Sequence, residues 1–147
     1  MTVEKNYHAL ISDKIFMGAA ADVESMVKNE GIEVVIDLRG EANESGYPTV
    51  GVLRVQTQLT DQSNLIQAEA FREAIQAVTD AYHQNKKVAF HCGGGKGRTG
   101  TVAVGTLIAL GLCKTVDEAE AKVKEIRHII DIKPAQRESL LKLFPNG

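Results

Sequence analysis

The apolar positions of the chain fall into two patterns, short strand-like runs and longer segments with helical spacing. Residues 32–38 are mostly apolar and rich in β-branched side chains, which is typical of a buried strand. Residues 53–55 and 88–91 form two shorter strand-like segments. Near the N-terminus, an apolar pair on each side of Ser12-Asp13 predicts two short strands joined by a turn. The sequence therefore predicts a sheet of four to five strands.

Helices are predicted between these strands. Apolar residues recur at helical spacing through residues 65–84, which predicts an amphipathic helix. Residues 101–110 are mostly small or aliphatic, which suits a helix that is covered nearly all round. Asp22 is placed to cap a helix over residues 23–29, and Gly31 is placed to end it.

Capping signals mark two further helices near the C-terminus. Thr115 and Glu118 have the spacing of a capping box, which opens a helix that runs to about residue 127. Pro134 suits the first turn of a last helix that ends near residue 143. Strands that alternate with helices indicate an α/β fold, with a central, mostly parallel sheet and helices on both of its faces.

Composition and charge narrow the class of protein. The chain has 147 residues, of which 44% are hydrophobic and 24% charged, so we expect a single domain spanning residues 1–147, and a monomer. A net charge of −2 argues against nucleic-acid binding through a broad basic face. No segment approaches the ~20 apolar residues of a membrane span. The N-terminus lacks the basic start and apolar run of a signal peptide, so we predict no membrane insertion and a cytoplasmic location.

The two cysteines, Cys92 and Cys113, are expected to be free thiols in a reducing compartment. No group of histidines and cysteines in the sequence has the spacing of zinc ligands. We therefore predict neither a metal nor another cofactor.

The candidate chemistry lies in a glycine-rich segment between a predicted strand and a predicted helix. It reads His91-Cys92-Gly93-Gly94-Gly95-Lys96-Gly97-Arg98-Thr99-Gly100. Five residues, four of them glycine, separate Cys92 from Arg98. In α/β sheets, ligands bind beyond the carboxyl ends of the strands, which is where this segment is expected to lie.

An anion is the ligand that this segment is suited to bind. The helix that follows points its N-terminus at the segment, and its unpaired N–H groups and dipole favour a negative charge there. The glycines allow successive backbone N–H groups, from residue 93 to residue 97, to converge without side-chain clashes. Arg98 supplies a planar fork for two phosphate oxygens. The same field favours the thiolate form of Cys92, so we predict a phosphate site with a nucleophilic sulfur beneath it.

A Walker loop and a purely structural turn both fit the segment less well. A Walker loop requires Gly-Lys followed directly by Ser or Thr, whereas Gly97 follows Lys96 here. A tight turn around a buried cysteine would need neither Arg98 nor so many glycines.

The segment resembles the signature loop of the cysteine-based protein tyrosine phosphatases, in which His-Cys, five residues, Arg and then Ser or Thr follow one another. The compact length and the strand-like residues 34–39 resemble the dual-specificity branch of that family. The resemblance implies the cysteine-phosphatase fold, with Cys92 as nucleophile and Arg98 as phosphate clamp. It implies that the Thr99 hydroxyl bonds the thiolate. It also implies that His91 is not a base but lies behind the loop, holds the backbone by a hydrogen bond and helps to set the acidity of the thiol.

A leaving alkoxide or phenoxide needs a proton, and therefore a general acid. The family carries an aspartate on a mobile loop upstream of the cysteine, and Asp61 occupies such a place between a predicted strand and the helix over residues 65–84. Alternatively, Asp61 merely caps that helix. Asp37 is the competing acid, but its place within an apolar strand favours a structural contact, for example with Arg39.

Several further residues have weaker signals. In many family members a glutamine orients the hydrolytic water, and Gln136 is the candidate, although the chain lacks the usual arginine-rich run before it. A surface position on a helix is the alternative for Gln136. Tyr47 and Arg39 lie near a loop that could rim the pocket, with ordinary loop positions as the alternative. A second thiol can protect an oxidised catalytic cysteine, but Cys113 is more simply a partly buried small residue.

The predicted activity is hydrolysis of phosphate monoesters, with phosphotyrosine of proteins as the leading substrate and phosphoserine or phosphothreonine as additional ones. The chain shows no tyrosine-bearing recognition loop of the kind that makes a deep phosphotyrosine slot in larger relatives. Lys96 favours an alternative, because a lysine at that place resembles the lipid and inositol phosphatases and would attract substrates with several phosphates. An alternative of another class is a binding module that captures phosphorylated partners without turnover.

Overall fold

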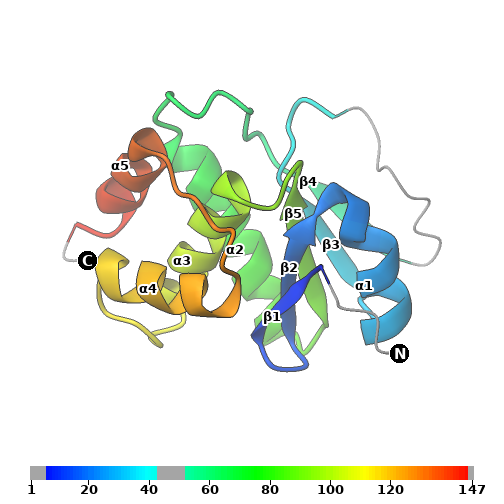
Figure 1. Ribbon diagram of the computed structural model, residues 1–147. Helices are drawn as coiled ribbons and strands as arrows, with labels where there is room; N and C mark the ends of the chain where they lie inside the picture. Colours follow the sequence, from blue (N-terminus) through cyan, green and yellow to red (C-terminus); the bar gives the residue numbers. More distant parts are fainter. Residues whose placement is uncertain (1–5, 43–51, 146–147) are drawn as a thin grey trace.

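The computed structural model describes residues 6–42 and 52–145, and its strands form one sheet (Figure 1). The strands are β1 (His8–Ile11), β2 (Ile15–Ala19), β3 (Val34–Asp37), β4 (Leu53–Gln56) and β5 (Val88–Cys92). Their order across the sheet is β1-β2-β5-β3-β4. β1 pairs antiparallel with β2, and the other neighbours are parallel. The prediction of a mostly parallel sheet of four to five strands is confirmed.

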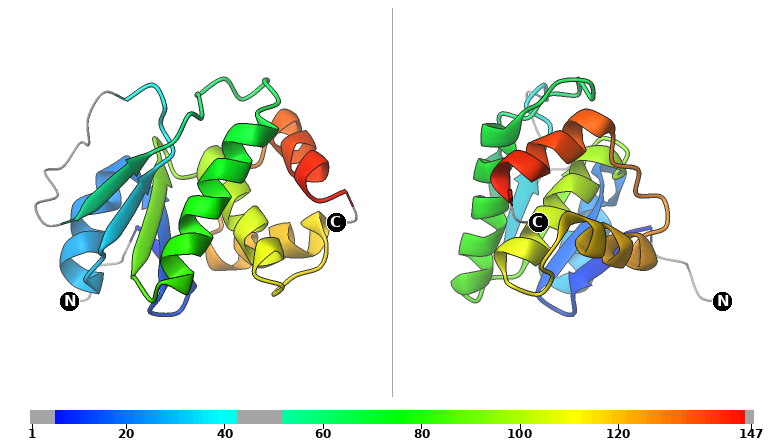
Figure 2. Two further views of the ribbon diagram at one scale, coloured as in Figure 1. Left: turned by 180° about the vertical axis from the view of Figure 1, so that it is seen from behind. Right: turned by 90° about the vertical axis from the view of Figure 1, so that its left-hand side faces the viewer.

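Helices cover both faces of this sheet, as the alternating sequence pattern predicts (Figure 1). They are the short 3-10 turn η1 (Ala20–Asp22), α1 (Val23–Glu30), α2 (Ala68–His83), α3 (Gly97–Ala109), α4 (Val116–Ile126) and α5 (Pro134–Leu143). α1 packs on one face, where Met26 meets Phe16 and Val35 in a small core cluster. The helices α2, α3, α4 and α5 lie on the opposite face, with α2 beside α3 and α5 (Figure 2). Within residues 6–42 and 52–145, no helix is long and apolar enough to cross a bilayer.

β5 lies at the centre of the sheet and brings the glycine-rich segment to its carboxyl edge. All five residues of β5 are buried, because strands flank it and helices cover both faces. Ala19 of β2 is in register with Cys92, and Asp37 of β3 is in register with His91. The carboxyl ends of three parallel strands therefore surround the start of the segment.

The main helix boundaries differ from those predicted at two places, both next to the site. α2 begins at Ala68 rather than near residue 65, and Leu65 and Ile66 are 47% and 45% exposed. α3 begins at Gly97 rather than at residue 101, so Arg98 lies in its first turn.

Two predicted caps have different outcomes. Asp22 does not cap α1: its side chain accepts a hydrogen bond from the Ala19 N–H at 2.8 Å, because η1 turns the chain just before the helix. Thr115 does cap α4, with the Glu118 N–H donating to its Oγ1 at 3.0 Å.

Candidate active site

The glycine-rich segment forms a loop between β5 and α3. Cys92 is the last residue of β5, and Gly97 is the first residue of α3. The Gly93 carbonyl accepts a hydrogen bond from the Ala20 N–H at 3.1 Å, which fixes the loop to the turn after β2. The N-terminus of α3 thus faces the loop, as an anion site requires.

Cys92 and Thr99 contact each other within this loop. The Cys92 N–H donates to Thr99 Oγ1 at 3.0 Å, so the hydroxyl proton is free to point elsewhere. Thr99 Oγ1 lies 3.0 Å from Cys92 Sγ and 3.3 Å from the Gly18 carbonyl oxygen. The hydroxyl can therefore donate to the sulfur, and this would stabilise a thiolate.

The Arg98 guanidinium is held on one edge by Leu38 and Glu41. Its Nη1 donates to the Leu38 carbonyl at 3.1 Å and to Glu41 Oε1 at 2.8 Å, and its Nη2 donates to Glu41 Oε2 at 3.0 Å. A guanidinium has five N–H groups, so the one on Nε and the second on Nη2 remain, side by side on one edge. This edge matches two oxygens of a phosphate.

Glu41 is a residue of the site that sequence reasoning missed. The hydrogen bond from Arg98 lowers the pKa of the Glu41 carboxyl, in spite of partial burial, so this residue is an anion at neutral pH. The sequence holds no signal for it, because Glu41 falls in a predicted loop far from the motif.

His91 contacts the loop from behind. Its Nδ1 lies 3.1 Å from the Cys92 carbonyl oxygen, and since a carbonyl only accepts, Nδ1 carries the proton. Burial lowers the pKa of His91, against the opposing charge of Asp37, so the neutral ring is favoured. Nε2 is buried without a hydrogen-bond partner and lies 3.9 Å from Asp37 Oδ1.

Asp37 is a structural carboxylate rather than a member of the cavity. Its side chain is fully buried and accepts hydrogen bonds from Arg39 at 3.0 Å and Arg54 at 2.7 Å. Burial alone would raise the pKa of Asp37, but these two arginines outweigh it and lower the pKa to about 2. An acid this strong is ionised at neutral pH and cannot donate a proton there.

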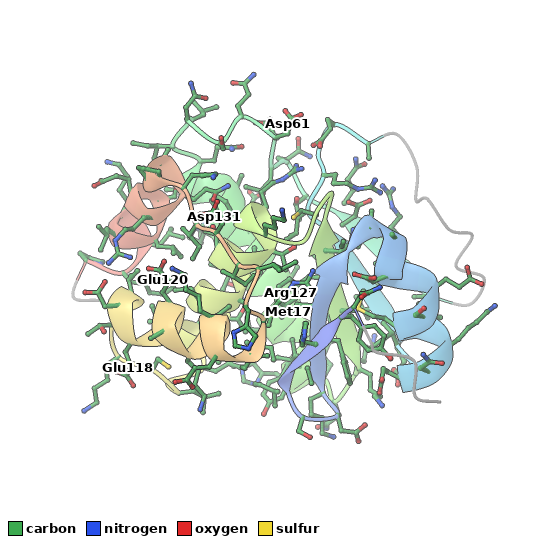
Figure 3. The ribbon with its side chains drawn as sticks, viewed as in Figure 1. Met17, Asp61, Glu118, Glu120, Arg127 and Asp131 are labelled. Atoms are coloured by element: carbon green, nitrogen blue, oxygen red, sulfur yellow. The ribbon has the colours of Figure 1, made fainter. Side chains whose placement is uncertain are left out.

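One open cavity, with a volume of about 360 Å³, gathers most of the predicted site residues. It is lined by Asp61, Ser63, Cys92, Gly93, Gly94, Lys96, Gly97, Arg98, Asp131, Lys133 and Gln136. Figure 3 shows Asp61 on the loop before α2 and Asp131 on the segment between α4 and α5. His91, Gly95 and Thr99 lie outside this lining, although they belong to the same loop or contact it.

The Gln136 side chain, 4% exposed, is fixed against the loop. Its Oε1 accepts a hydrogen bond from the Lys133 N–H at 2.9 Å. A Cβ added to Gly97 would lie 3.0 Å from the Gln136 amide nitrogen, so a larger residue there would push this side chain away from the loop. This places an amide group at the wall of the cavity, beside Lys133 and Asp131.

The remaining candidates lie elsewhere. Arg39 pairs with Asp37 and is not among the residues that line the cavity, and Tyr47 lies outside the described residues. Cys113 lines a different cavity from Cys92, and burial raises the pKa of its thiol. Within residues 6–42 and 52–145, no cluster of His, Cys, Asp and Glu side chains is suited to hold a metal ion.

The chain belongs to the dual-specificity phosphatases: the family model "Dual specificity phosphatase, catalytic domain" matches residues 15–145. The predicted membership of the dual-specificity branch is thereby confirmed. No curated protein sequence matches the chain.

Solved structures of phosphatases share the fold. PTPMT1 has a TM-score of 0.75 at 21% identity, covering 95% of this chain and 94% of its own. Human DUSP28 has a TM-score of 0.81 at 16% identity, covering 97% and 95%. Tk-PTP in its active form has a TM-score of 0.80 at 21% identity, covering 99% and 100%. PTPMT1 is also known in complex with PI(5)P, with a TM-score of 0.77 at 20% identity, covering 95% of both chains. At these identities the likeness is one of fold.

Proposed function

We propose that this protein hydrolyses phosphate monoesters through a phosphocysteine on Cys92. One observation carries the proposal: a sulfur, a guanidinium and a carboxyl group, from Cys92, Arg98 and Asp61, line the same cavity at the N-terminus of α3. A nucleophile, a clamp for oxyanions and a proton donor are the groups that phosphoryl transfer to a thiolate needs.

In the first step, the Cys92 thiolate attacks phosphorus, and an S–P bond forms as the P–O bond to the leaving group breaks. The free edge of Arg98 and the loop N–H groups bind the three non-bridging oxygens as their charge redistributes. Asp61 donates its proton to the departing oxygen, so that an alcohol or phenol leaves rather than an anion.

In the second step, a water molecule attacks the phosphocysteine. The Asp61 carboxylate takes a proton from the water, the S–P bond breaks, and inorganic phosphate leaves. The Thr99 hydroxyl, 3.0 Å from Sγ, stabilises the sulfur as it becomes a thiolate again. The Gln136 amide, at the wall of the same cavity, is assigned to orient the water.

The test is hydrolysis of para-nitrophenyl phosphate by the reduced protein and by Cys92→Ser. The wild-type protein should turn over, whereas Cys92→Ser should lose turnover and still bind phosphotyrosyl peptide, because the cradle remains. Cys113→Ser is the matched control and should keep full activity. Full activity of Cys92→Ser would refute the nucleophile. No hydrolysis by the wild-type protein between about pH 5 and 8, together with phosphopeptide binding, would instead make the protein a binding module.

For the substrate, we propose phosphotyrosine of proteins, with phosphoserine and phosphothreonine as additional targets. The cavity is open, and of the two lysines in its lining Lys133 is neutralised by Asp131, which accepts a hydrogen bond from it at 2.5 Å. A single unpaired lysine gives only a small advantage to a substrate with several phosphates.

A phosphoinositide or inositol phosphate is the second candidate, because Lys96 and Lys133 both line the cavity. Turnover of phosphotyrosyl peptides and of soluble inositol phosphates by one preparation separates the two. A preference for the inositol compounds that is lost in Lys96→Ala, but not in the exposed control Lys86→Ala, would overturn the leading choice. A cytoplasmic monomer with one domain over residues 1–147 remains our prediction.

A further inference from the structure

Arg127, the residue after α4, is a buried cation next to the phosphate-binding loop (Figure 3). Its side chain is only 2% exposed. Burying a charged group is costly unless its N–H groups find acceptors, so the contacts of this side chain indicate what it does. Burial also lowers the pKa of Arg127, although arginine stays protonated at neutral pH.

The hydrogen-bond partners of Arg127 come from two segments. Its Nε donates to the Gly95 carbonyl at 2.8 Å. Its Nη1 donates to the Asn6 carbonyl at 2.5 Å and lies 3.1 Å from His8 Nδ1. The guanidinium thus ties the middle of the loop to the chain at the start of β1.

The backbone conformation of Gly95 and its lack of a side chain both allow this contact. Its φ of +70° is in the left-handed region, which favours glycine. A Cβ at this position would lie 2.5 Å from Arg127 Nη2 and 2.9 Å from the Ala19 nitrogen. The loop is therefore pinned at Gly95 between β2 and the guanidinium.

The direction of one peptide group follows from this contact. A trans peptide is planar, so the Gly95 carbonyl and the Lys96 N–H point in opposite directions. Arg127 lines a second cavity of about 510 Å³, whereas Lys96 and Arg98 line the active-site cavity, and Gly94 lines both. The loop is thus a wall between two cavities, and a carbonyl drawn toward Arg127 turns the Lys96 N–H toward the opposite side.

We propose that Arg127 is a positioning residue of the phosphate-binding loop: it holds the Gly95 carbonyl behind the loop and thereby aims the Lys96 N–H at the bound phosphate. This inference deepens the proposed function and rests on it. The charge of Arg127 is partly offset by the Asp22 carboxylate but also acts on Cys92 across the loop, so it favours an anion on that side.

Two substitutions of equal length separate the hydrogen bond from the charge. In Arg127→Gln the amide nitrogen takes the place of Nε and can still donate to Gly95, whereas Arg127→Met has no donor. Binding of inorganic phosphate is measured by how well it protects Cys92 from iodoacetamide, with the Cys92 peptide quantified by mass spectrometry. We expect Arg127→Met to weaken phosphate binding by at least about tenfold, and Arg127→Gln by less than about threefold.

The control is Arg137→Met, since Arg137 pairs with Asp117 and Glu120 on the surface and does not contact the loop. It should leave phosphate protection unchanged. A loss of thermal stability in Arg127→Met without weaker phosphate binding would make Arg127 a purely structural residue and overturn the inference. Equal weakening in Arg127→Met and Arg127→Gln would overturn it too, because the donor to Gly95 would then be irrelevant.

A measurement on the wild-type protein covers the case in which Arg127→Met does not fold. The backbone amide resonance of Lys96 should shift strongly on titration with phosphate. A Lys96 amide that does not respond, while that of Gly94 or Gly97 does, would overturn the inference. Neither readout needs turnover. If the protein binds phosphate but hydrolyses no phosphate ester, the proposed function is wrong, whereas the role of Arg127 in phosphate binding still stands.

Discussion

Among single residues, Asp61 and Asp131 form a matched pair, because both carboxyl groups line the active-site cavity from different segments (Figure 3). The hydrogen bond from Lys133 lowers the pKa of Asp131, which makes it a poor proton donor. We therefore expect Asp61→Asn to slow hydrolysis of a phosphotyrosyl peptide by about 10²–10⁴-fold, and Asp131→Asn to have little effect.

The leaving group provides the control for this prediction. A substrate whose leaving group is stable as an anion needs no proton, so its hydrolysis should suffer much less in Asp61→Asn. Steady-state kcat for the two substrates measures the difference. Equal losses for both would remove Asp61 from the role of acid.

Glu41 orients the side chain of Arg98, since it occupies one edge of the guanidinium and leaves the other free. In Glu41→Gln one of the two carboxylate oxygens is replaced by an NH₂ group, which donates instead of accepting. The Arg98 guanidinium then loses one of the hydrogen bonds that fix its orientation. We expect kcat/KM for para-nitrophenyl phosphate to fall by about 10- to 100-fold, as for other misplacements of catalytic groups. Glu24→Gln, at an exposed ion pair on α1, should have no effect. Tighter phosphate binding without loss of kcat would mean that Glu41 competes with the substrate instead.

The sequence predicts the residues of the loop because they are neighbours in the chain, so a motif of ten residues contains them all. It does not predict their partners. Glu41 reaches Arg98 across 57 positions, and Arg127 reaches Gly95 across 32 positions. Such pairs depend on tertiary structure, and on sequence alone each charge is indistinguishable from an ordinary surface charge.

At the scale of elements, hydrophobic periodicity predicts the presence of a helix more accurately than its first residue. Apolar Leu65 and Ile66 continue the spacing of α2, yet they lie outside it and are about half exposed. The Gln67 N–H donates to Ser139 Oγ at 2.9 Å, and its side chain accepts from the Thr60 N–H, also at 2.9 Å. These hydrogen bonds hold residues 65–67 in a loop that continues the segment carrying Asp61, which lines the cavity.

The packing of α3 against α2 depends on a glycine. A Cβ on Gly105 would lie 2.9 Å from Ile75 Cγ1 and closer still to its Cδ1. Helix propensity alone would make Gly105→Ala stabilising by up to about 1 kcal/mol. Overpacking a filled core costs about 1–3 kcal/mol, so we expect a net loss of stability in urea unfolding.

The exposed Ala109 on the same helix gives the reference for this prediction. Ala109→Gly, at the last position of the helix, should cost at most about 0.5–1 kcal/mol through propensity alone. If Gly105→Ala instead raised the free energy of unfolding by as much as Ala109→Gly lowers it, the Ile75 side chain would not lie in contact with Gly105.

For the molecule as a whole, the alternation of strands and helices predicts the fold class but not the order of strands. β5 is inserted between β2 and β3, which come much earlier in the chain. The central place of β5, whose five residues are all buried, is a property of the assembled sheet. It is also what places His91 beside Asp37, in a register that no local pattern encodes.

The buried pair of His91 and Asp37 should make global stability depend on pH in two windows. Burial lowers the pKa of His91 from 6.5, so below pH 6.5 the unfolded chain binds a proton that the folded protein does not. Stability is therefore complete above about pH 6.5 and falls as the pH decreases, by at most about 1.4 kcal/mol per pH unit for this one group. The pKa of Asp37 is lowered from 3.8 to about 2, so its contribution is present above pH 3.8 and is lost as the pH falls toward 2.

Replacing the imidazole separates these two windows. His91→Asn keeps a donor for the Cys92 carbonyl but cannot titrate, so the fall in Tm between about pH 6.5 and 5 should flatten while the loss near pH 3 persists. His83→Gln, an exposed histidine at the end of α2, should leave the profile unchanged. If His91→Asn keeps the slope of the wild-type protein in the upper window, the proton is taken up elsewhere, and the ring behind the loop is not held neutral by burial. The same result would also mean that His91 is protonated at acidic pH. Because its ring contacts the backbone of Cys92, a positive charge would then lie directly behind the loop.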